Sequence, residues 1–317
     1  MKTTMSAFGH SVFRLSSYIT RSRSALKSLK FVTRPLVQAC PPALRKLPVI
    51  CPALILPVVH AWWGSSSTPV TPTVEEGTPE EEPDPVQQAI VQADELYSIG
   101  DTVELYQFLL QHKDSSDAGI LWRLARATRD YAHLPTCSPE DRKTLTYQAL
   151  QFAEQALHID SKDFACHKWY AICISDVGDY EGTKAKIANA YVIRDHFKEA
   201  ITLNPKDATS IHLLGLWCFT MAEMPWYQAK IAAVIFATPP TSTYDEALGY
   251  FLQAESVDPG FYSMNLLMLG KTYVRLGNTS AAMLWLDKVR SCPSKSEEDS
   301  QAKLEAEELL KTLGATG

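Results

Sequence analysis

From about residue 86 to the C-terminus, apolar residues recur three and four positions apart, and no segment shows the strict alternation of a strand. This spacing places apolar side chains on one face of an α-helix. Three of the predicted helices end alike, with an aliphatic residue three positions after an alanine and Asp or Asn one position later: Ala156–Asp160, Ala200–Asn204 and Ala254–Asp258. Small, aliphatic or aromatic residues stand three and seven positions before each alanine, where they let a neighbouring helix approach closely.

The spacing of these endings indicates a repeat. The last residues of the three endings, and a fourth, looser ending at Cys292, are separated by 44, 54 and 34 residues. A tetratricopeptide repeat is a helix pair of about 34 residues. The two longer intervals predict insertions of about ten and twenty residues, at 180–193 and 221–243. Each insertion marks either a binding face or an extension of the core.

The expected fold is therefore all-α: a tetratricopeptide-like helical repeat superhelix with a disordered or partly anchored N-terminal leader. The repeats occupy 86–295 and form at least five antiparallel helix pairs. Ser296 and Asp299 have the spacing of a capping box, and apolar residues follow at helical intervals. This pattern predicts a C-terminal capping helix at 296–317.

The N-terminal region has a different composition. Residues 1–46 contain nine Lys or Arg and no Asp or Glu, which is typical either of a mitochondrial targeting segment or of a disordered basic leader. Residues 47–63 form an apolar segment that is short for a membrane span and contains three prolines, but it has the basic and aromatic flanks of an anchor. Residues 64–85 are an acidic, Pro-rich linker.

Charge and motifs exclude several classes of function. Residues 75–317 carry a net charge of −15, whereas a nucleic-acid-binding protein needs a basic face. The seven cysteines have no spacing typical of a disulfide framework or a zinc site, which favours a reducing compartment. Phosphate-binding loops, nucleophile elbows and paired metal-binding histidines are also missing from the sequence. We therefore expect no enzyme activity, no cofactor and no metal.

One part of the repeat region resembles a known family. The resemblance covers roughly 86–313 and is most specific over 163–263. It rests on five stretches: His167–Gly182 (HKWYAICISDVGDYEG), Lys184–Tyr191, Leu203–Thr209, Ala222–Tyr227 and Phe236–Pro240. These are similar to the regulator of microtubule dynamics family, with its shortest member as the nearest match. The resemblance implies a tetratricopeptide-like protein of the cytoplasm and cytoskeleton that associates with microtubules, the spindle and spindle poles, without catalytic residues.

Two hypotheses about function follow. The first is a non-enzymatic, microtubule-associated scaffold that binds peptide or protein partners in the groove of the repeats. The second, favoured by the basic leader, is a mitochondrial or organelle-anchored adaptor with membrane contact through 47–63.

Attachment to an acidic microtubule surface would require the leader, a local basic patch or an adaptor protein, because the repeat region is itself acidic. The candidate residues for such a patch are Lys168, Lys184, Lys186 and Lys230. Taken singly, each of these lysines also fits ordinary solvated surface.

Overall fold

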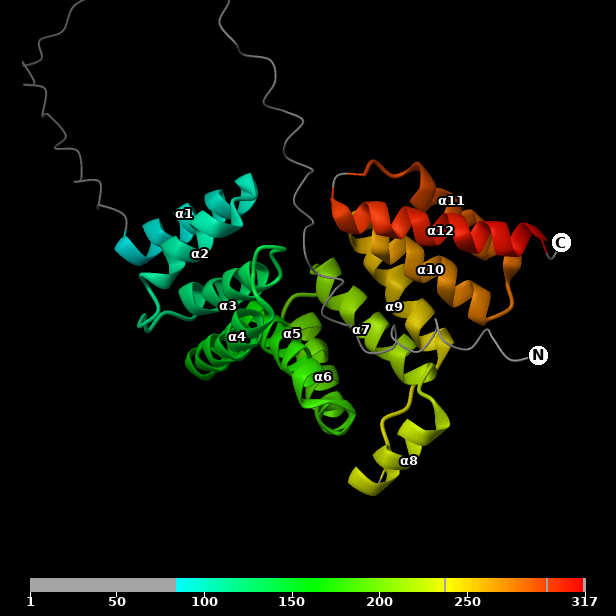
Figure 1. Cartoon of the computed structure of the whole chain (residues 1–317), viewed down its shortest axis with the longest axis horizontal. Coiled ribbons are helices and arrows are strands. Elements are labelled where there is room, and N and C mark those ends of the chain that lie inside the picture. Colours follow the sequence, from blue (N-terminus) through cyan, green and yellow to red (C-terminus); the bar gives the residue numbers. More distant parts are fainter. Residues whose placement is uncertain (1–83, 237, 295, 316–317) are drawn as a thin grey trace, which may run out of the picture. The chain divides into compact units, whose positions relative to one another are not determined.

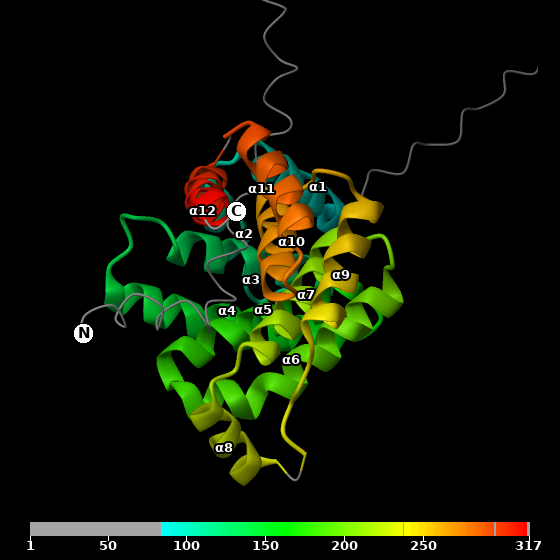
Figure 2. The same ribbon diagram turned by 90° about the vertical axis from the view of Figure 1, so that its right-hand side faces the viewer.

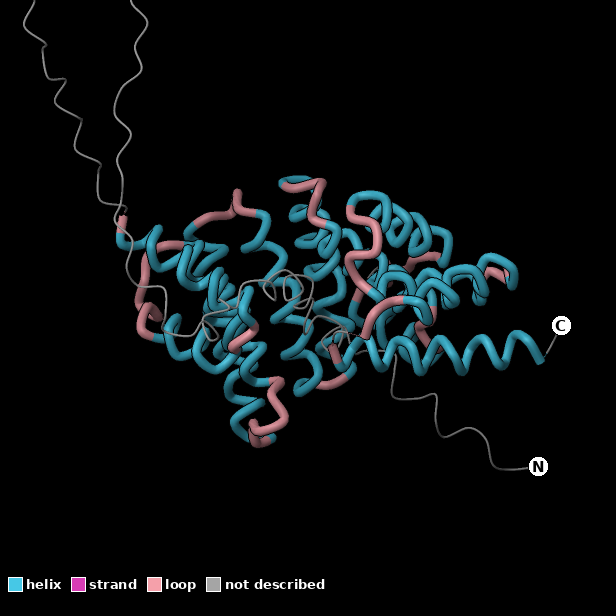
Figure 3. Tube along the Cα trace, turned by 90° about the horizontal axis from the view of Figure 1, so that it is seen from above, coloured by secondary structure: helices cyan, strands magenta, loops and turns pink. Residues whose placement is uncertain are grey.

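The computed structural model describes residues 84–236, 238–294 and 296–315, and within them it contains helices and no strand (Figures 1 and 3). The helices are α1 (Pro85–Ile99), α2 (Thr102–Leu110), α3 (Ala118–Ala132), α4 (Pro139–Ile159), α5 (Phe164–Glu181), α6 (Thr183–Leu203), α7 (Ala208–Ala222), α8 (Trp226–Ile235), α9 (Tyr244–Val257), α10 (Ser263–Arg275), α11 (Thr279–Ser291) and α12 (Glu297–Ala315). The all-α, tetratricopeptide-like fold is confirmed. The predictions for 1–46, 47–63 and nearly all of 64–85 lie outside the described residues.

The helices pack as successive antiparallel pairs, and each pair lies against the next (Figure 1). Figure 2 shows the last pair, α10 and α11, beside α9. The pairs are α1 with α2, α3 with α4, α5 with α6, α7 with α9, and α10 with α11. Helix α12 packs against both α10 and α11, where it buries Ala302 and Ala306. The backbone N–H of Asp299 donates to the Ser296 hydroxyl, so the predicted capping box begins this helix.

The recurring helix endings have a common structural cause. The alanine of each ending is fully buried, and a larger side chain would force neighbouring helices apart. The backbone N–H of the Asp or Asn four residues later donates the last helical hydrogen bond to that alanine: Asp160 to Ala156, Asn204 to Ala200 and Asp258 to Ala254. The pattern in the sequence therefore marks where each second helix packs and where it stops.

The two longer intervals are accommodated in different ways. In the first, α5 and α6 are 18 and 21 residues long, and only Gly182 stands between them. In the second, the separate helix α8 lies between α7 and α9 and packs against α6. The Tyr191 hydroxyl of α6 donates to the backbone oxygen of Thr238 at 2.8 Å, and the Tyr191 ring contacts Phe236 edge-on. Trp226 and Val234 of α8 are largely exposed.

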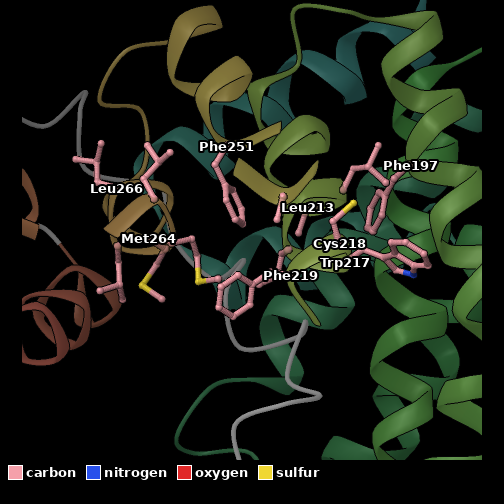
Figure 4. Packing of buried hydrophobic residues seen from close by; sticks show 14 of the residues in the cluster. Phe197, Leu213, Trp217, Cys218, Phe219, Phe251, Met264 and Leu266 are labelled. Carbon is pink, nitrogen blue, oxygen red and sulfur yellow. The ribbon is translucent and has the colours of Figure 1, made fainter. Parts of the chain in front are cut away.

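The largest core cluster runs from α5 to α12, and its side chains interdigitate at the centre of the α7–α9 pair (Figure 4). Gly215 of α7 lies so close to the Phe251 ring of α9 that a Cβ atom there would stand 2.9 Å from the ring carbons. Gly270 of α10 has the same relation to Leu286 of α11, at 2.6 Å. In each pair a glycine on the first helix makes room for a large side chain on the second.

Candidate functional site

A cavity of about 150 Å³ lies where the first helices of the pairs face one another. The cavity is lined by residues of α1, α3, α5 and α7 and by the residues that lead into α10. Six of the lining residues are aromatic: Tyr97, Trp122, Phe164, Trp169, Phe261 and Tyr262. The polar side chains among them are Arg126, Lys168, Thr209 and His212. An apolar wall with a few polar groups is the usual composition of a binding site.

Three of the cavity residues stand at the same distance in the chain from a capping aspartate. Asp117, Asp163 and Asp207 each cap a first helix by accepting a hydrogen bond from a backbone N–H in its first turn. The fifth residue after each of them lines the cavity: Trp122, Lys168 and His212, respectively. Arg126 follows Trp122 by one helical turn and lies on the same face of α3.

Arg126 is held in the cavity wall with part of its guanidinium group unsatisfied. The residue is only 7% exposed, and neither Nε nor Nη2 makes a hydrogen bond. The guanidinium carbon lies 3.6 Å from the centre of the Tyr97 ring and 5.2 Å from that of Trp122. Burial lowers the pKa of Arg126 from its ordinary value, but an arginine keeps its charge at any physiological pH.

The nearest carboxylate is already bonded to another arginine. Asp94 accepts two hydrogen bonds from Arg123, from Nε at 2.9 Å and from Nη2 at 2.7 Å, whereas Nη2 of Arg126 is 3.6 Å from it. Burial raises the pKa of Asp94, but the hydrogen bonds and charges of Arg123 and Arg126 outweigh burial and bring the pKa below its ordinary value. Asp94 is therefore ionised, and it pairs closely with Arg123 and at a longer distance with Nη2 of Arg126.

His212, on another part of the cavity wall, has an acceptor atom that lacks a hydrogen-bond donor. It is 1% exposed, and its Nδ1 lies 2.9 Å from Oδ1 of Asn265. Asn265 uses its amide nitrogen to donate to the backbone oxygen of Phe251, so its Oδ1 accepts and His212 Nδ1 donates. Burial lowers the pKa of His212 to about 4, which keeps the ring neutral at pH 7. Its Nε2 is then a buried acceptor with no hydrogen-bond partner.

The four lysines predicted as a basic patch have different surroundings. Lys168 lines the cavity, where its Nζ contacts Asp207 at 3.1 Å and lies over the Phe164 ring. Lys186 forms an ion pair with Asp179 near the other end of α5, roughly 15 Å from Lys168 along the helix axis. Lys184 is exposed at the start of α6, and Lys230 is exposed on α8, where it lies over Trp226.

Metal-binding clusters are missing from the described part of the chain, and two buried thiols are held in the protonated form. There, no group of three or more His, Cys, Asp or Glu side chains is placed to hold a metal ion. Burial raises the pKa of the Cys166 thiol to about 12, and it raises that of Cys173 still further. Such thiols are protonated at neutral pH and do not act as nucleophiles. None of the helices in the described ranges is both long and apolar enough to cross a membrane.

Comparison with known proteins gives the family. The family model described as Regulator of microtubule dynamics protein 1-3 matches residues 89–314. Regulator of microtubule dynamics protein 1 of Bos taurus is 60% identical over 226 residues, which are 71% of this chain and 71% of the relative. Regulator of microtubule dynamics protein 3 of Xenopus laevis is 34% identical over 236 residues, which are 72% of this chain and 50% of the relative.

A solved structure supports the repeat architecture. A thermophilic TPR protein of Thermus thermophilus superimposes with a TM-score of 0.50 and 15% identity, over 69% of this chain and 97% of its own. At that level of identity the likeness concerns the fold alone. The family model and the 60% identical relative show the family of the chain as well as its fold. By these matches the chain belongs to the regulator of microtubule dynamics family.

Proposed function

We propose that the chain is a non-enzymatic, microtubule-associated scaffold that binds partner proteins through the first helices of its repeat array. The observation that carries the proposal is the cavity on those helices, which is lined by six aromatic side chains and a few polar ones. An apolar wall with a few polar groups is the usual composition of a site that binds a partner. The names of the relatives support a role in microtubule dynamics.

We propose further that the protein acts in the cytoplasm, on the cytoskeleton at the spindle and spindle poles. A purely electrostatic contact between the array and a microtubule has less support, because Lys168 and Lys186 are each paired with an aspartate. The basic leader at 1–46 and the exposed Lys184 and Lys230 are the remaining direct candidates. Attachment through another microtubule-associated protein is the alternative route.

Co-sedimentation of the full chain with microtubules across a salt series tests this function. Three variants separate the routes: one with the nine basic leader residues replaced by Gln, one with Lys184→Gln and Lys230→Gln, and a control with the exposed Lys113→Gln and Lys311→Gln. Salt-sensitive binding that only the first variant loses assigns attachment to the leader. Absence of binding by every form, both alone and with a cell extract added, would refute microtubule association.

The second candidate function is a mitochondrial or organelle-anchored adaptor, and the acid-free basic leader favours it. Imaging of the full chain with a C-terminal fluorescent tag separates the two candidates. Mitochondrial signal that disappears in the leader variant would support the adaptor. Signal on the spindle that persists in the same variant would support the scaffold.

A further inference from the structure

Helix α8 presents an apolar face to solvent. Five exposed side chains follow one another along it at helical spacing and form what we call the outer face of α8: Trp226, Tyr227, Lys230, Ile231 and Val234. Trp226 is 71% exposed and Val234 is 87% exposed, although both are apolar. Monomeric proteins seldom keep several large apolar side chains together in water, so such a face indicates contact with another molecule.

The contacts of α8 with α6 fix the direction of the outer face. Gln228 and Ala232, on the opposite side of the helix, are buried, and α8 packs against α6. The segment that follows is held by Tyr191 of α6, whose hydroxyl donates to the backbone oxygen of Thr238 and whose ring contacts Phe236. Figures 1 and 2 both show α8 at the edge of the array. The outer face therefore belongs to a protruding helix, which suits a broad surface better than a cleft.

The charge around α8 differs from that of the rest of the array. Residues 224–244 contain one Lys and no Arg, Asp or Glu, and α6 contains four basic residues against two acidic ones. Residues 75–317 as a whole carry a net charge of −15. Exposed apolar side chains elsewhere have acidic neighbours in the chain, as Val103 has Glu104 and Leu304 has Glu305. An anionic surface is thus repelled by most of the array but attracted by α6 and α8.

The residue types of the outer face are those of a membrane interface. Trp and Tyr are enriched where the acyl chains of a bilayer meet the headgroups, because each has an apolar ring and one polar group. The Lys230 ammonium lies 4.8 Å from the centre of the Trp226 ring. A lysine so placed buries its stem beside the indole and keeps its charge at the level of the lipid phosphates. With ten residues, α8 is too short to cross a bilayer and would lie on its surface.

A second copy of the chain is a poorer occupant of this face. A stable protein–protein interface takes about 20–30 residues from each side. The outer face of α8 offers five. A bilayer requires no matching shape, and each apolar side chain that enters it adds to the binding.

We propose that the outer face of α8 docks the protein on an anionic lipid bilayer, with Trp226 and Val234 inserted among the lipids and Lys230 at their phosphate groups. This contact goes beyond the proposed scaffold function, and it uses neither the groove of the first helices nor residues 47–63. The repeat array itself meets the membrane, in an orientation that α6 sets.

Quenching of Trp226 by lipid tests the insertion on the full chain. The vesicles contain phosphatidylcholine and phosphatidylserine in a two-to-one ratio, with bromine on the acyl chains, and bromine quenches only an indole that reaches those chains. The contribution of Trp226 is the quenching lost in Trp226→Phe, whose ring still fits the interface. Trp285→Phe is the matched control, because Trp285 of α11 also lies beside a lysine, Lys288. The loss in Trp226→Phe should exceed that in Trp285→Phe several-fold. Every form keeps the same N-terminal leader, so the difference belongs to α8.

The charge of the vesicles tests the lipid class. Quenching of Trp226 should be weaker with brominated phosphatidylcholine alone, and Lys230→Gln should reduce the preference for anionic vesicles more than the exposed Lys113→Gln does. Helicity and melting temperature establish that each variant is folded.

Two results would overturn the proposal. One is an equal loss of quenching in Trp226→Phe and Trp285→Phe. The other is a wild-type dimer in solution that becomes a monomer in the double variant Trp226→Ser, Val234→Ser, because it would assign the outer face to a second copy. No microtubules are present, so either result leaves the co-sedimentation experiment intact, and the reverse also holds.

Discussion

Arg129 of α3 donates from Nε to Oδ2 of Asp176 in α5 at 2.6 Å, and both side chains are almost completely inaccessible to water. The pair joins the first helices of two successive repeats. Removing the charges of both groups from water is costly, so the pair stabilises the interface only while it is complete.

Arg129→Met should therefore lower the free energy of unfolding by about 3–5 kcal/mol, because it leaves the Asp176 carboxylate buried without its charge partner. The double variant Arg129→Met, Asp176→Leu should recover most of this loss. Urea denaturation measures both. Arg290→Met breaks an exposed pair with Asp287 and should change the stability by at most about 1 kcal/mol. A loss in Arg129→Met no larger than in this control would contradict the role of the buried pair.

His212 should make stability depend on pH. Its pKa falls from an ordinary value of 6.5 to about 4 because burial disfavours the charged ring. The neutral ring is favoured by folding, so its contribution is complete above about pH 6.5 and is lost as the pH falls toward 4. The difference in pKa corresponds to about 3 kcal/mol.

Chemical denaturation at a series of pH values measures this contribution. The slope of stability against pH between 4 and 6.5 should be smaller in His212→Gln than in the wild-type chain. His158→Gln, at an exposed position near the end of α4, is the control and should keep the wild-type slope. Parallel curves for the wild-type chain and His212→Gln would show that the buried ring does not titrate as expected.

The close approach at Gly215 predicts opposite effects of two glycine substitutions. Gly215→Ala places a methyl group 2.9 Å from the Phe251 ring and should cost about 1–3 kcal/mol. Gly249→Ala, in α9, meets open space and should be neutral or stabilise the helix by up to about 1 kcal/mol. Thermal unfolding compares the two. Combining Gly215→Ala with Phe251→Leu should restore part of the loss, and strict additivity would argue against this contact.

The paired histidines of α5 and α6 should occupy defined tautomers. Nδ1 of His167 and Nδ1 of His196 are 2.8 Å apart, and Nε2 of His167 is 2.9 Å from the backbone oxygen of Ser161. A carbonyl only accepts, so His167 donates from Nε2 and accepts at Nδ1, and His196 donates from Nδ1. Burial is the largest cause that lowers the pKa of His196, and the nearby His167 lowers this pKa further.

Nitrogen chemical shifts of the two rings at pH 7.5 should show a proton on Nε2 of His167 and on Nδ1 of His196. The reverse assignment would contradict the hydrogen bond to Ser161. As the pH falls, protonation of His196 should reduce the stability of the fold, because its folded-state pKa is the lower one.

The sequence predicts the second helices of the array more directly than the first. Ala156, Ala200 and Ala254 share one chemical requirement, a small side chain at a close helix contact, so the same letters recur. The cavity positions share only their distance from a capping aspartate. A tryptophan, a lysine and a histidine stand at those positions, so no shared residue type marks them in the sequence.

The sequence interpretation included Lys168 for its charge and missed Arg126 and His212. The signal that could have identified them is the fifth position after Asp117, Asp163 and Asp207, together with the position one turn beyond it. The carboxylates that pair with Lys168 and Lys186 could not be anticipated, because those contacts arise only when the helices pack.

The position of the cavity also affects how the array unfolds. In a repeat protein each unit contacts only its neighbours, so separate parts can open almost independently. Here Tyr97 of the first pair and Tyr262 at the start of the last pair line the same small volume. A bound ligand would therefore couple units that are distant in the chain and raise the cost of opening any one of them by mass action. Occupancy of this cavity would make largely independent repeats unfold as one cooperative unit.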